Sequence, residues 1–429
     1  MDEILSRECI DYFKSNKGFK RVFEKIRDKY KSLGTLGGTI VLNNLTEAEK
    51  DALSGFFRKD YYKKSASIKV EKFIEALNNT KFSTLEFGVI LEKYFGEKLI
   101  SKKEEKIIYE EEKNIYFQEI IDIIDGKRGR NWFCSILESK ENAYRIINQK
   151  YDENKEFLKI NLISVFKALD IISFEKSKTM RLAVLASTVT RDPHWFDYDK
   201  DAGKFLVFAL EYFLKVSCHE NAESLAETLY SAGIIKDEVS NYTLCSGVLA
   251  YDNYGKVHEG WKGFYRKGEP LQVSLWNISK IHRISSTTGK VFVFENPTVF
   301  SEILYRTSKL KPALVCTFGN FKLASLILLD KLAESGSIIY YSGDFDPEGI
   351  VMADKLKQRY KDKLILWRYD VEDYLSVISK VQITAVRLNK LKKLNSNELM
   401  DICEVIKKYS RAAYQEMLID EYESDIKGL

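Results

Sequence analysis

The sequence lacks the features of several protein classes. It holds only 5 prolines and 22 glycines in 429 residues, too few for long disordered linkers. Its 4 histidines are scattered and its 6 cysteines form no CxxC pair, so a zinc site is not expected. Isolated cysteines of this kind indicate free thiols in a reducing compartment. No apolar run approaches the roughly 20 residues that a membrane helix needs.

The chain starts with the acidic, polar segment MDEILSRECIDYF, which does not have the pattern of a signal peptide. We therefore expect a cytoplasmic protein with no membrane partner. The formal net charge is only +4, which is compatible with nucleic-acid binding but does not demand it. A hydrophobic content of 45% suffices for packed cores, and the length predicts two or three domains.

Helical periodicity dominates the first part of the chain, and alternating strands and helices begin near residue 289. The fold class predicted is α+β multidomain, in three parts. Residues 1–100 form a mostly helical N-terminal arm domain, whose basic side chains suggest contact with DNA or a partner. Residues 101–265 are helical and winged-helix-like, because the short strand-like pieces Tyr242–Leu249, Tyr251–Val257 and Trp261–Tyr265 follow helices. Residues 266–429 form an α/β domain.

Four apolar runs in the last part predict the strands of a parallel sheet. They cover residues 291–294, 312–317, 338–341 and 364–368, and helical patterns separate them. Right-handed crossovers bring the carboxyl ends of such strands to one edge, where α/β proteins bind their ligands. Polar side chains that follow these strands are therefore candidates for a common site.

Three acids follow two of these strands. Glu295 comes directly after the first strand, and Asp344 and Asp346 follow the third, in the sequence SGDFDPEGI. Two aspartates separated by one residue point to the same side of an extended chain, and a divalent cation relieves their repulsion. Hard oxygen ligands favour Mg²⁺ or Mn²⁺. The alternative is a solvated turn whose aspartates cap the next helix.

Two further polar segments have an ordinary alternative that we favour. The basic and aromatic run Arg58–Lys64 could contact a phosphate backbone, but we favour an exposed loop with its tyrosines folded onto a core. The segment TRDPHWFD, Thr190–Asp197, holds a cluster of charged side chains around a proline. A knot of capping bonds and ion pairs is the simpler interpretation.

The runs FENPTVF, PALVCTFGN and YYSGDFDPEGI, with TRDPHWFD upstream, resemble a known family. A glutamate, a glycine-bearing turn and DxD after successive strands look like a Toprim domain, the metal-binding module of topoisomerases and primases. The fuller pattern is similar to the JetD-type Toprim subunits of bacterial Wadjet plasmid-defence systems. The motifs cover roughly the last third of the chain, and TRDPHWFD extends the resemblance to its middle.

The resemblance implies a metal-dependent endonuclease that cleaves double-stranded plasmid DNA. It implies a homodimer, similar to the A subunit of topoisomerase VI, that works with an SMC-like ATPase complex and its accessory subunits. By motif, Glu295, Asp344 and Asp346 are the catalytic, metal-binding acids for Mg²⁺ or Mn²⁺. Asn296 and Asn320 lie on the same edge and are expected to orient phosphate or substrate. Glu348 is expected either to bind a second cation or to cap the following helix.

Three alternatives stay open. Arg58-Lys59-Asp60-Tyr61-Tyr62 is similar to the surroundings of the tyrosine nucleophile of topoisomerase VI, which would make the enzyme a transesterase. A haloacid-dehalogenase type of phosphatase also uses DxD, but after the first strand of its domain. A non-catalytic DNA-binding assembly subunit is the third alternative, although all three acids are present.

Overall fold

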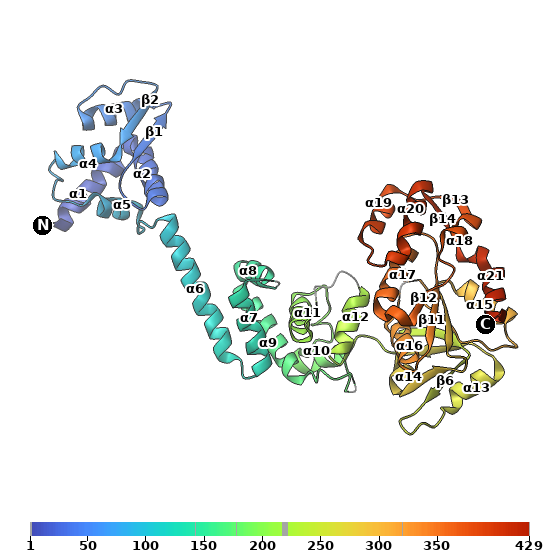
Figure 1. The fold of residues 1–429 in the computed structure, drawn as a ribbon. Helices are drawn as coiled ribbons and strands as arrows, with labels where there is room; N and C mark the ends of the chain where they lie inside the picture. Colours follow the sequence, from blue (N-terminus) through green and yellow to red (C-terminus); the bar gives the residue numbers. More distant parts are fainter. Residues whose placement is uncertain (1, 142, 177, 217–221, 320, 429) are drawn as a thin grey trace. The chain divides into compact units, whose positions relative to one another are not determined.

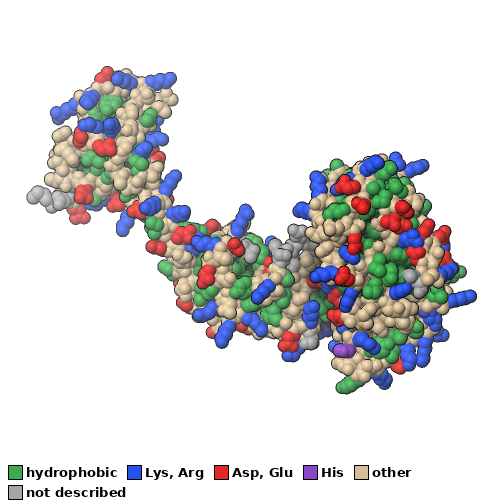
Figure 2. All heavy atoms as spheres, in the orientation of Figure 1, with side chains coloured by type: hydrophobic (Ala, Val, Ile, Leu, Met, Phe, Trp, Pro, Cys, Tyr) green, Lys and Arg blue, Asp and Glu red, His purple; other side chains and the backbone are tan. Residues whose placement is uncertain are grey.

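The computed structural model describes residues 2–141, 143–176, 178–216, 222–319 and 321–428. The chain divides into two compact units, residues 1–123 and 124–429 (Figure 1). Lys and Arg side chains are interspersed with Asp and Glu over the visible face of each unit, in keeping with the small net charge (Figure 2).

The described part of the first unit is mostly helical and contains a two-stranded sheet, β1 and β2, whose strands are separated in the chain by helix α3. Strands β1 and β2 pair antiparallel, from Thr39 with Lys69 to Asn43 with Ser65. Its elements are α1 (Asp2–Ser15), η1 (Lys17–Phe19), α2 (Lys20–Leu33), β1 (Thr39–Asn43), α3 (Glu47–Phe57), β2 (Ser65–Lys69), α4 (Val70–Asn78), α5 (Phe87–Phe95) and α6 (Lys102–Ile123).

A cluster of phenylalanines forms the core of the first unit. Phe13, Phe19, Phe23 and Phe73 are fully buried, and the rings of Phe13 and Phe19 pack edge to face with centroids 4.9 Å apart. The helix after β1 begins at a capping box, in which Thr46 and Glu49 exchange side-chain and backbone hydrogen bonds. Local sequence signals and burial therefore agree in this unit.

The second unit begins with a bundle of helices. Trp132, Phe133 and Leu162 are fully buried among them. The elements are α7 (Lys127–Ser139), α8 (Tyr144–Glu153), α9 (Lys155–Ile171), β3 (Met180–Arg181), α10 (Leu182–Thr190), α11 (Asp201–Leu214), α12 (Ala222–Ser231) and β4 (Ile234–Ile235). Helix α12 is tied to helix α17 (Pro347–Tyr360) by ion pairs from Arg359 to Glu227, at 2.6 Å, and from Lys355 to Glu223, at 3.3 Å.

A six-stranded sheet organises the rest of the second unit, within the described residues. Its order is β12-β11-β9-β10-β5-β7. The first four of these strands are parallel to one another. Strand β5 pairs antiparallel with β10, and β7 pairs antiparallel with β5. The strands of this sheet are β5 (Tyr242–Ser246), β7 (Leu271–Ser274), β9 (Lys290–Phe294), β10 (Leu314–Cys316), β11 (Ile338–Ser342) and β12 (Leu364–Leu366).

Helices and smaller strand pairs surround this sheet. Strands β6 and β8 form one antiparallel pair and β13 and β14 another (Figure 1). These elements are β6 (Val248–Tyr251), α13 (Glu259–Lys267), α14 (Leu275–Lys280), β8 (Arg283–Ser286), α15 (Pro297–Arg306), α16 (Leu323–Glu334), α17 (Pro347–Tyr360), η2 (Lys361–Lys363), α18 (Val371–Ser376), β13 (Ile378–Gln382), α19 (Ala385–Leu388), η3 (Asn389–Lys393), η4 (Asn397–Leu399), α20 (Met400–Tyr409), β14 (Arg411–Ala413), η5 (Gln415–Leu418) and α21 (Ile419–Gly428).

The predicted fold class, α+β multidomain with a parallel sheet in the last part, is confirmed. All four predicted parallel strands are present. Two local predictions are wrong. Trp261–Tyr265 lies within helix α13, with Trp261 buried against the core. Within Tyr251–Val257 only Tyr251 belongs to a strand, because a turn follows it in which the Gly255 N–H donates to the Asp252 carbonyl. The sheet also includes β5, which lies before residue 266, the predicted start of the last part. The division of the chain into three parts stays a prediction. Among the described residues, no helix is both long and apolar enough to cross a membrane.

Candidate functional site

Two neighbouring parallel strands bring Glu295 and the aspartates together. Strand β9 pairs with β11 in a register that sets Phe294 opposite Ser342. Glu295 follows the end of β9, and Asp344 follows the end of β11. The Asp344 backbone N–H donates a hydrogen bond to Glu295 Oε2, at 3.3 Å. The sequence-based expectation that these acids share the carboxyl edge of the sheet therefore agrees with the structure.

Backbone pairing fixes the two aspartates on either side of a buried ring. Phe345 is fully buried, and its N–H donates to the carbonyl of Ala413, at 2.9 Å. Asp346 is the N-cap of α17, because its Oδ1 accepts from the Gly349 N–H at 2.8 Å, and Pro347 occupies the first helical position. The helix-capping role considered for these aspartates thus belongs to Asp346.

The four acids fall into two pairs. We call Glu295 and Asp344 the inner pair, and Asp346 and Glu348 the outer pair. Among the described residues, no basic side chain forms an ion pair with the inner pair. Glu295 accepts the Asp344 N–H, and Asp344 Oδ1 accepts the backbone N–H of Gln415, at 3.0 Å. Among the described residues, the hydrogen bonds that hold the inner carboxylates come from backbone N–H groups.

Burial makes the charge of the inner pair costly. Burial, with a smaller contribution from the Asp344 carboxylate, raises the pKa of Glu295 to about 7. Burial likewise raises the pKa of Asp344 to about 6, against the opposing effect of the Gln415 N–H and with support from the nearby Glu416 charge. Carboxylates in this situation gain the most from an added cation.

The outer pair already has cations. Arg387 contacts Asp346 Oδ2, at 2.5 Å, and Glu348 Oε2, at 2.6 Å, and Lys390 Nζ contacts Glu348 Oε1, at 2.8 Å. Partial burial would raise the pKa of Glu348, but the hydrogen bonds from Arg387 and Lys390 outweigh it and lower the pKa to about 2. Neither basic side chain was predicted from the sequence, because they come from the α19–η3 segment far along the chain.

Gly343 leaves room for the Glu295 carboxylate. A Cβ atom at Gly343 would lie 2.6 Å from Tyr369 Oη, 2.9 Å from Glu295 Oε2 and 3.0 Å from Tyr341 Oη. Those distances are below normal contact, so only glycine fits between the two phenols and the carboxylate. Tyr341 is fully buried and its ring stacks on that of Tyr369. The glycine of the SGDFD motif is therefore a packing requirement of the inner pair.

The two asparagines do not both reach the site. Asn296 caps α15, because its Oδ1 accepts the Thr298 N–H at 2.8 Å. Its Nδ2 donates to Glu416 Oε1, at 2.5 Å. Its side-chain groups are therefore engaged in structural bonds beside the inner pair. Asn320 lies outside the described residues, so its predicted role stays a prediction.

The acids fit a divalent cation only in part. Among the described residues, no group of three or more His, Cys, Asp or Glu side chains is arranged to hold a metal ion. The inner pair fits, because two partly buried carboxylates share one edge and no described basic side chain forms an ion pair with them. The outer pair does not fit in this arrangement, because Arg387 and the Gly349 N–H engage the two oxygens of Asp346.

The Arg58–Lys64 run folds as an exposed loop after α3. Tyr62 Oη donates a hydrogen bond to Asp51 Oδ1, and this bond raises the pKa of the phenol. The Tyr61 ring packs on Phe57, with centroids 5.4 Å apart, and burial raises its pKa. A raised pKa makes a phenol harder to convert to the nucleophilic phenolate. The surroundings of Tyr61 and Tyr62 therefore do not activate either tyrosine as a nucleophile.

The side chains of the Thr190–Asp197 turn form a local cluster of capping hydrogen bonds and ion pairs. Asp192 Oδ1 accepts the His194 N–H at 2.8 Å, and His194 Nδ1 lies 3.0 Å from Asp197 Oδ2. Trp195 Nε1 donates to Ser164 Oγ, at 2.8 Å, which fastens the turn to α9. The simpler interpretation of this segment therefore agrees with its geometry.

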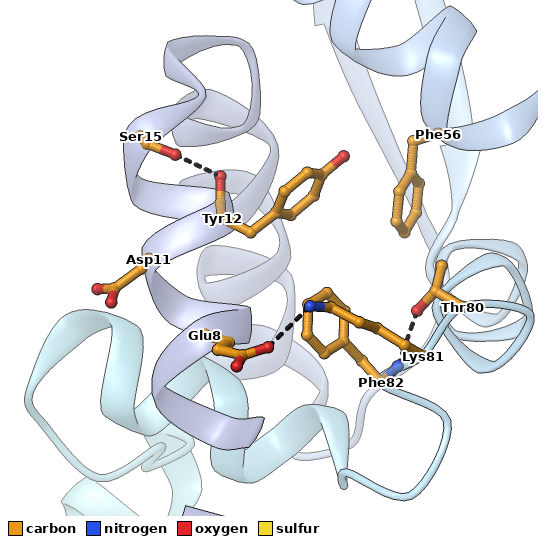
Figure 3. Close-up of a pocket in the computed structure, with 8 residues that line it drawn as sticks. All are labelled: Glu8, Asp11, Tyr12, Ser15, Phe56, Thr80, Lys81 and Phe82. Atoms are coloured by element: carbon orange, nitrogen blue, oxygen red, sulfur yellow. Dashed lines mark hydrogen bonds and ion pairs between the residues drawn. The ribbon is translucent and has the colours of Figure 1, made fainter. Parts of the chain in front are cut away.

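A cavity of about 690 Å³ opens on the first unit (Figure 3). Aromatic rings of Tyr12, Phe56 and Phe82 line it, and Lys81 Nζ pairs with Glu8 Oε2 across it, at 2.7 Å. Because Lys81 already neutralises Glu8, the cavity presents mainly aromatic surface. It contains none of the site residues predicted from the sequence.

Two known protein families match parts of the chain. Residues 36–250, just over half of the chain, match a family described as "Protein of unknown function N-terminus (DUF3323)". The chain belongs to the DUF3323 family. Residues 271–426 match a second description, "Protein of unknown function C-terminus (DUF2399)". In this DUF3323 protein all four acids of the site fall within the DUF2399 match. No curated protein matches the chain.

Proposed function

We propose that this chain is the DNA-cleaving subunit, of JetD type, of an SMC-associated anti-plasmid system. It hydrolyses phosphodiester bonds of double-stranded DNA with Mg²⁺ or Mn²⁺, working as a homodimer beside an SMC-like ATPase and its accessory subunits. The observation that carries the proposal is the inner pair: Glu295 and Asp344 meet at the carboxyl edge of adjacent parallel strands, are partly buried, and form no ion pair with any basic side chain that the structure describes.

The residues of the chain orient the reactants. The Asp344 N–H fixes Glu295 Oε2, and the Gln415 N–H fixes Asp344 Oδ1, so both carboxylates have one defined direction. The amino end of α17, which starts at Pro347, lies beside them and favours a phosphate. A divalent cation at the inner pair would stabilise the charge of the reacting phosphate and lower the pKa of a water. Two such sites in a dimer would serve the two strands of a duplex.

The alternatives have less support. A tyrosine transesterase needs an activated phenol, whereas the pKa values of Tyr61 and Tyr62 are raised. A dehalogenase-type phosphatase needs an aspartate nucleophile after the first strand of the parallel set, whereas Asp344 follows β11. A non-catalytic assembly subunit would have no need for two carboxylates whose burial costs free energy.

Plasmid cleavage tests the proposal. The full chain, with its SMC partners, is incubated with supercoiled plasmid and Mg²⁺ or Mn²⁺. We expect linear product, and we expect Glu295→Ala and Asp344→Ala to abolish it. Glu334→Ala, at an exposed position on α16, is the matched control and should cleave normally. Unchanged cleavage by both site variants would overturn the metal assignment. DNA ends bound covalently to protein, and lost in Tyr61→Phe or Tyr62→Phe, would favour the tyrosine mechanism.

A further inference from the structure

A lysine lies over an aromatic ring at the same edge of the sheet as the inner pair. Lys322 Nζ is 3.8 Å from the ring centroid of Tyr242, the first residue of β5, and 5.7 Å from that of Phe318. Strand β5 runs antiparallel to β10, so its first residue lies at the edge where the parallel strands end. The Lys322 ammonium and the inner pair therefore share one edge, and β10 lies between β5 and β9.

The ammonium of Lys322 has aromatic rings beside it but no acceptor. Among the described residues, no carboxylate pairs with it and no carbonyl accepts a hydrogen bond from it. Other lysines of the same unit donate to backbone carbonyls: Lys331 to Ile281, Lys357 to Leu364 and Lys363 to Ala333. An ammonium has three N–H donors, and the face of a ring accepts none of them as an oxygen does. The donors of Lys322 are therefore available to a bound anion.

The backbone on both sides of Lys322 is fixed. The Gly319 N–H donates to the Glu295 carbonyl, at 3.1 Å, which ties the loop after β10 to the end of β9. The Ala324 N–H donates to Asn241 Oδ1, at 2.9 Å, which ties the start of α16 to the residue before β5. The ring contact then fixes the side chain as well. An ammonium held in this way loses little conformational freedom when it binds an anion.

The inner pair alone would repel the substrate proposed for this site. A phosphodiester is an anion, and Glu295 and Asp344 place two partly buried carboxylates at the edge that it approaches. Lysine is a point-charge ligand for phosphate, and Lys322 supplies the opposite charge. Neighbouring strands lie about 4.8 Å apart, so β5 is roughly 10 Å from β9, the length of about three nucleotides of one DNA strand. A strand that passes the inner pair can therefore place a phosphate on Lys322.

We propose that Lys322, held over the ring of Tyr242, is a binding site for a phosphodiester group of DNA beside the inner pair. The inference rests on the proposed function, since it assigns the side chain that receives the DNA backbone next to the reacting acids. The site needs no divalent cation, because the loop and the ring hold the ammonium without one. Its contribution to DNA binding is therefore measurable in EDTA, apart from any reaction.

The first test measures binding of a fluorescent 20-base-pair duplex to the full-length protein. Anisotropy in EDTA gives the affinity at several salt concentrations. Lys322→Met keeps the apolar stem without the charge, and Lys322→Gln keeps a polar end. Each should weaken binding about tenfold at low salt and reduce the slope of log affinity against log salt by about 1, the loss expected for one phosphate contact. Wild-type affinity and slope in both variants would overturn the inference.

The matched control is Lys280→Met. Lys280 also lies over a ring, that of Trp276 at 5.6 Å. Its neighbour Ile281 accepts a hydrogen bond from Lys331 in the last turn of α16, so Lys280 lies at the far end of that helix from Lys322. Lys280→Met removes the same charge and should change duplex affinity by about twofold or less. Equal losses at the two positions would indicate general attraction between charges and would contradict the inference.

The aromatic platform is tested separately. Tyr242→Leu removes the ring that holds the ammonium and should weaken duplex binding about two- to fivefold. Tyr242→Phe keeps the ring and should bind the duplex as wild type does. A loss in Tyr242→Phe as large as that in Tyr242→Leu would show that the hydroxyl, and not the cation–ring contact, carries the effect.

A conservative variant and the cleavage assay separate this inference from the proposed function. Lys322→Arg should restore duplex binding, which would exclude altered packing as the cause of the loss. Duplex binding that depends on Lys322, with no plasmid cleavage, would sink the nuclease and keep the phosphate site. Cleavage that depends on Glu295, with wild-type duplex binding by Lys322→Met, would do the reverse.

Discussion

The inner and outer pairs are chemically alike and electrostatically opposite. Asp344 and Asp346 are separated only by Phe345, yet the pKa of Asp344 is raised to about 6 while Asp346 contacts a guanidinium. The pKa of Glu295 is raised to about 7, and that of Glu348 is lowered to about 2. The difference lies in the partners: backbone N–H groups hold the inner pair, and basic side chains hold the outer pair.

A fifth acid, Asp354, shows what a purely structural carboxylate looks like. Asp354 is 4% exposed, and its oxygens accept the backbone N–H groups of Asn395 and Ser396, which fastens η3 and η4 to α17. Its bonds have an evident structural purpose. The inner pair lies instead at the carboxyl edge of the parallel strands, and each of its carboxylates accepts one backbone hydrogen bond. The comparison indicates that the candidate site is distinguished by carboxylates whose charged form is destabilised by burial, and not by the presence of a carboxylate as such.

The largest effect that we expect is a difference between the two pairs in the rate of plasmid cleavage. Asp344→Asn removes one carboxylate of the proposed cation site and should lower the rate of plasmid cleavage by at least about 100-fold, since cation stabilisation is worth several kcal/mol. Glu348→Gln removes an outer acid that contacts basic side chains and should cost about tenfold or less. Initial rates of linear product with Mg²⁺ measure both. Equal losses would mean that the two pairs act as one site.

The next effect concerns the space that the inner pair occupies. Gly343→Ala forces a methyl group against Tyr369, Glu295 and Tyr341, and should destabilise the protein by about 1–3 kcal/mol. Gly263→Ala is the matched control: it lies in α13, where an added Cβ has no neighbour within 4 Å, and it should be neutral or slightly stabilising. Denaturant unfolding gives both values. A neutral Gly343→Ala would show that the carboxylate moves away freely.

The smallest effect is a pair of opposite pH dependences in the cation-free protein. The pKa of Glu295 is raised to about 7 in the folded state, so its contribution to stability is present at low pH and is lost as the pH rises through 7. Glu295→Gln should therefore raise the Tm at pH 8 by about 2–4 °C, as for a gain near 1 kcal/mol, and change it little at pH 5.

The outer pair should behave in the opposite sense. The pKa of Glu348 is lowered to about 2, so its contribution is present above its ordinary pKa of 4.5 and is lost as the pH falls toward 2. Glu348→Gln should lower the Tm by about 1–2 °C between pH 6 and 8, the size typical of a partly exposed ion pair. Scanning fluorimetry in EDTA measures both variants, and Tm shifts of the same sign at pH 8 would contradict the comparison.

The sequence by itself determined the framework of the site. Apolar runs predicted the parallel strands, and the rule that parallel strands end at one edge placed Glu295 beside Asp344. The capping box of Thr46 and Glu49 was also predicted from the sequence, because its two residues are only three positions apart. Such features depend on a few neighbouring residues, so a pattern in the chain predicts them.

Only the tertiary structure decided how the acids differ. Arg387 meets Asp346 across 41 positions of sequence, and Gln415 meets Asp344 across 71. The tightness around Gly343 depends on Tyr369, from a turn after another strand. Burial and the choice of partner arise when distant segments pack together, because the dielectric surroundings of a carboxylate are set by all of its neighbours. The motif therefore names four acids, and the fold assigns two of them to backbone groups and two to basic side chains.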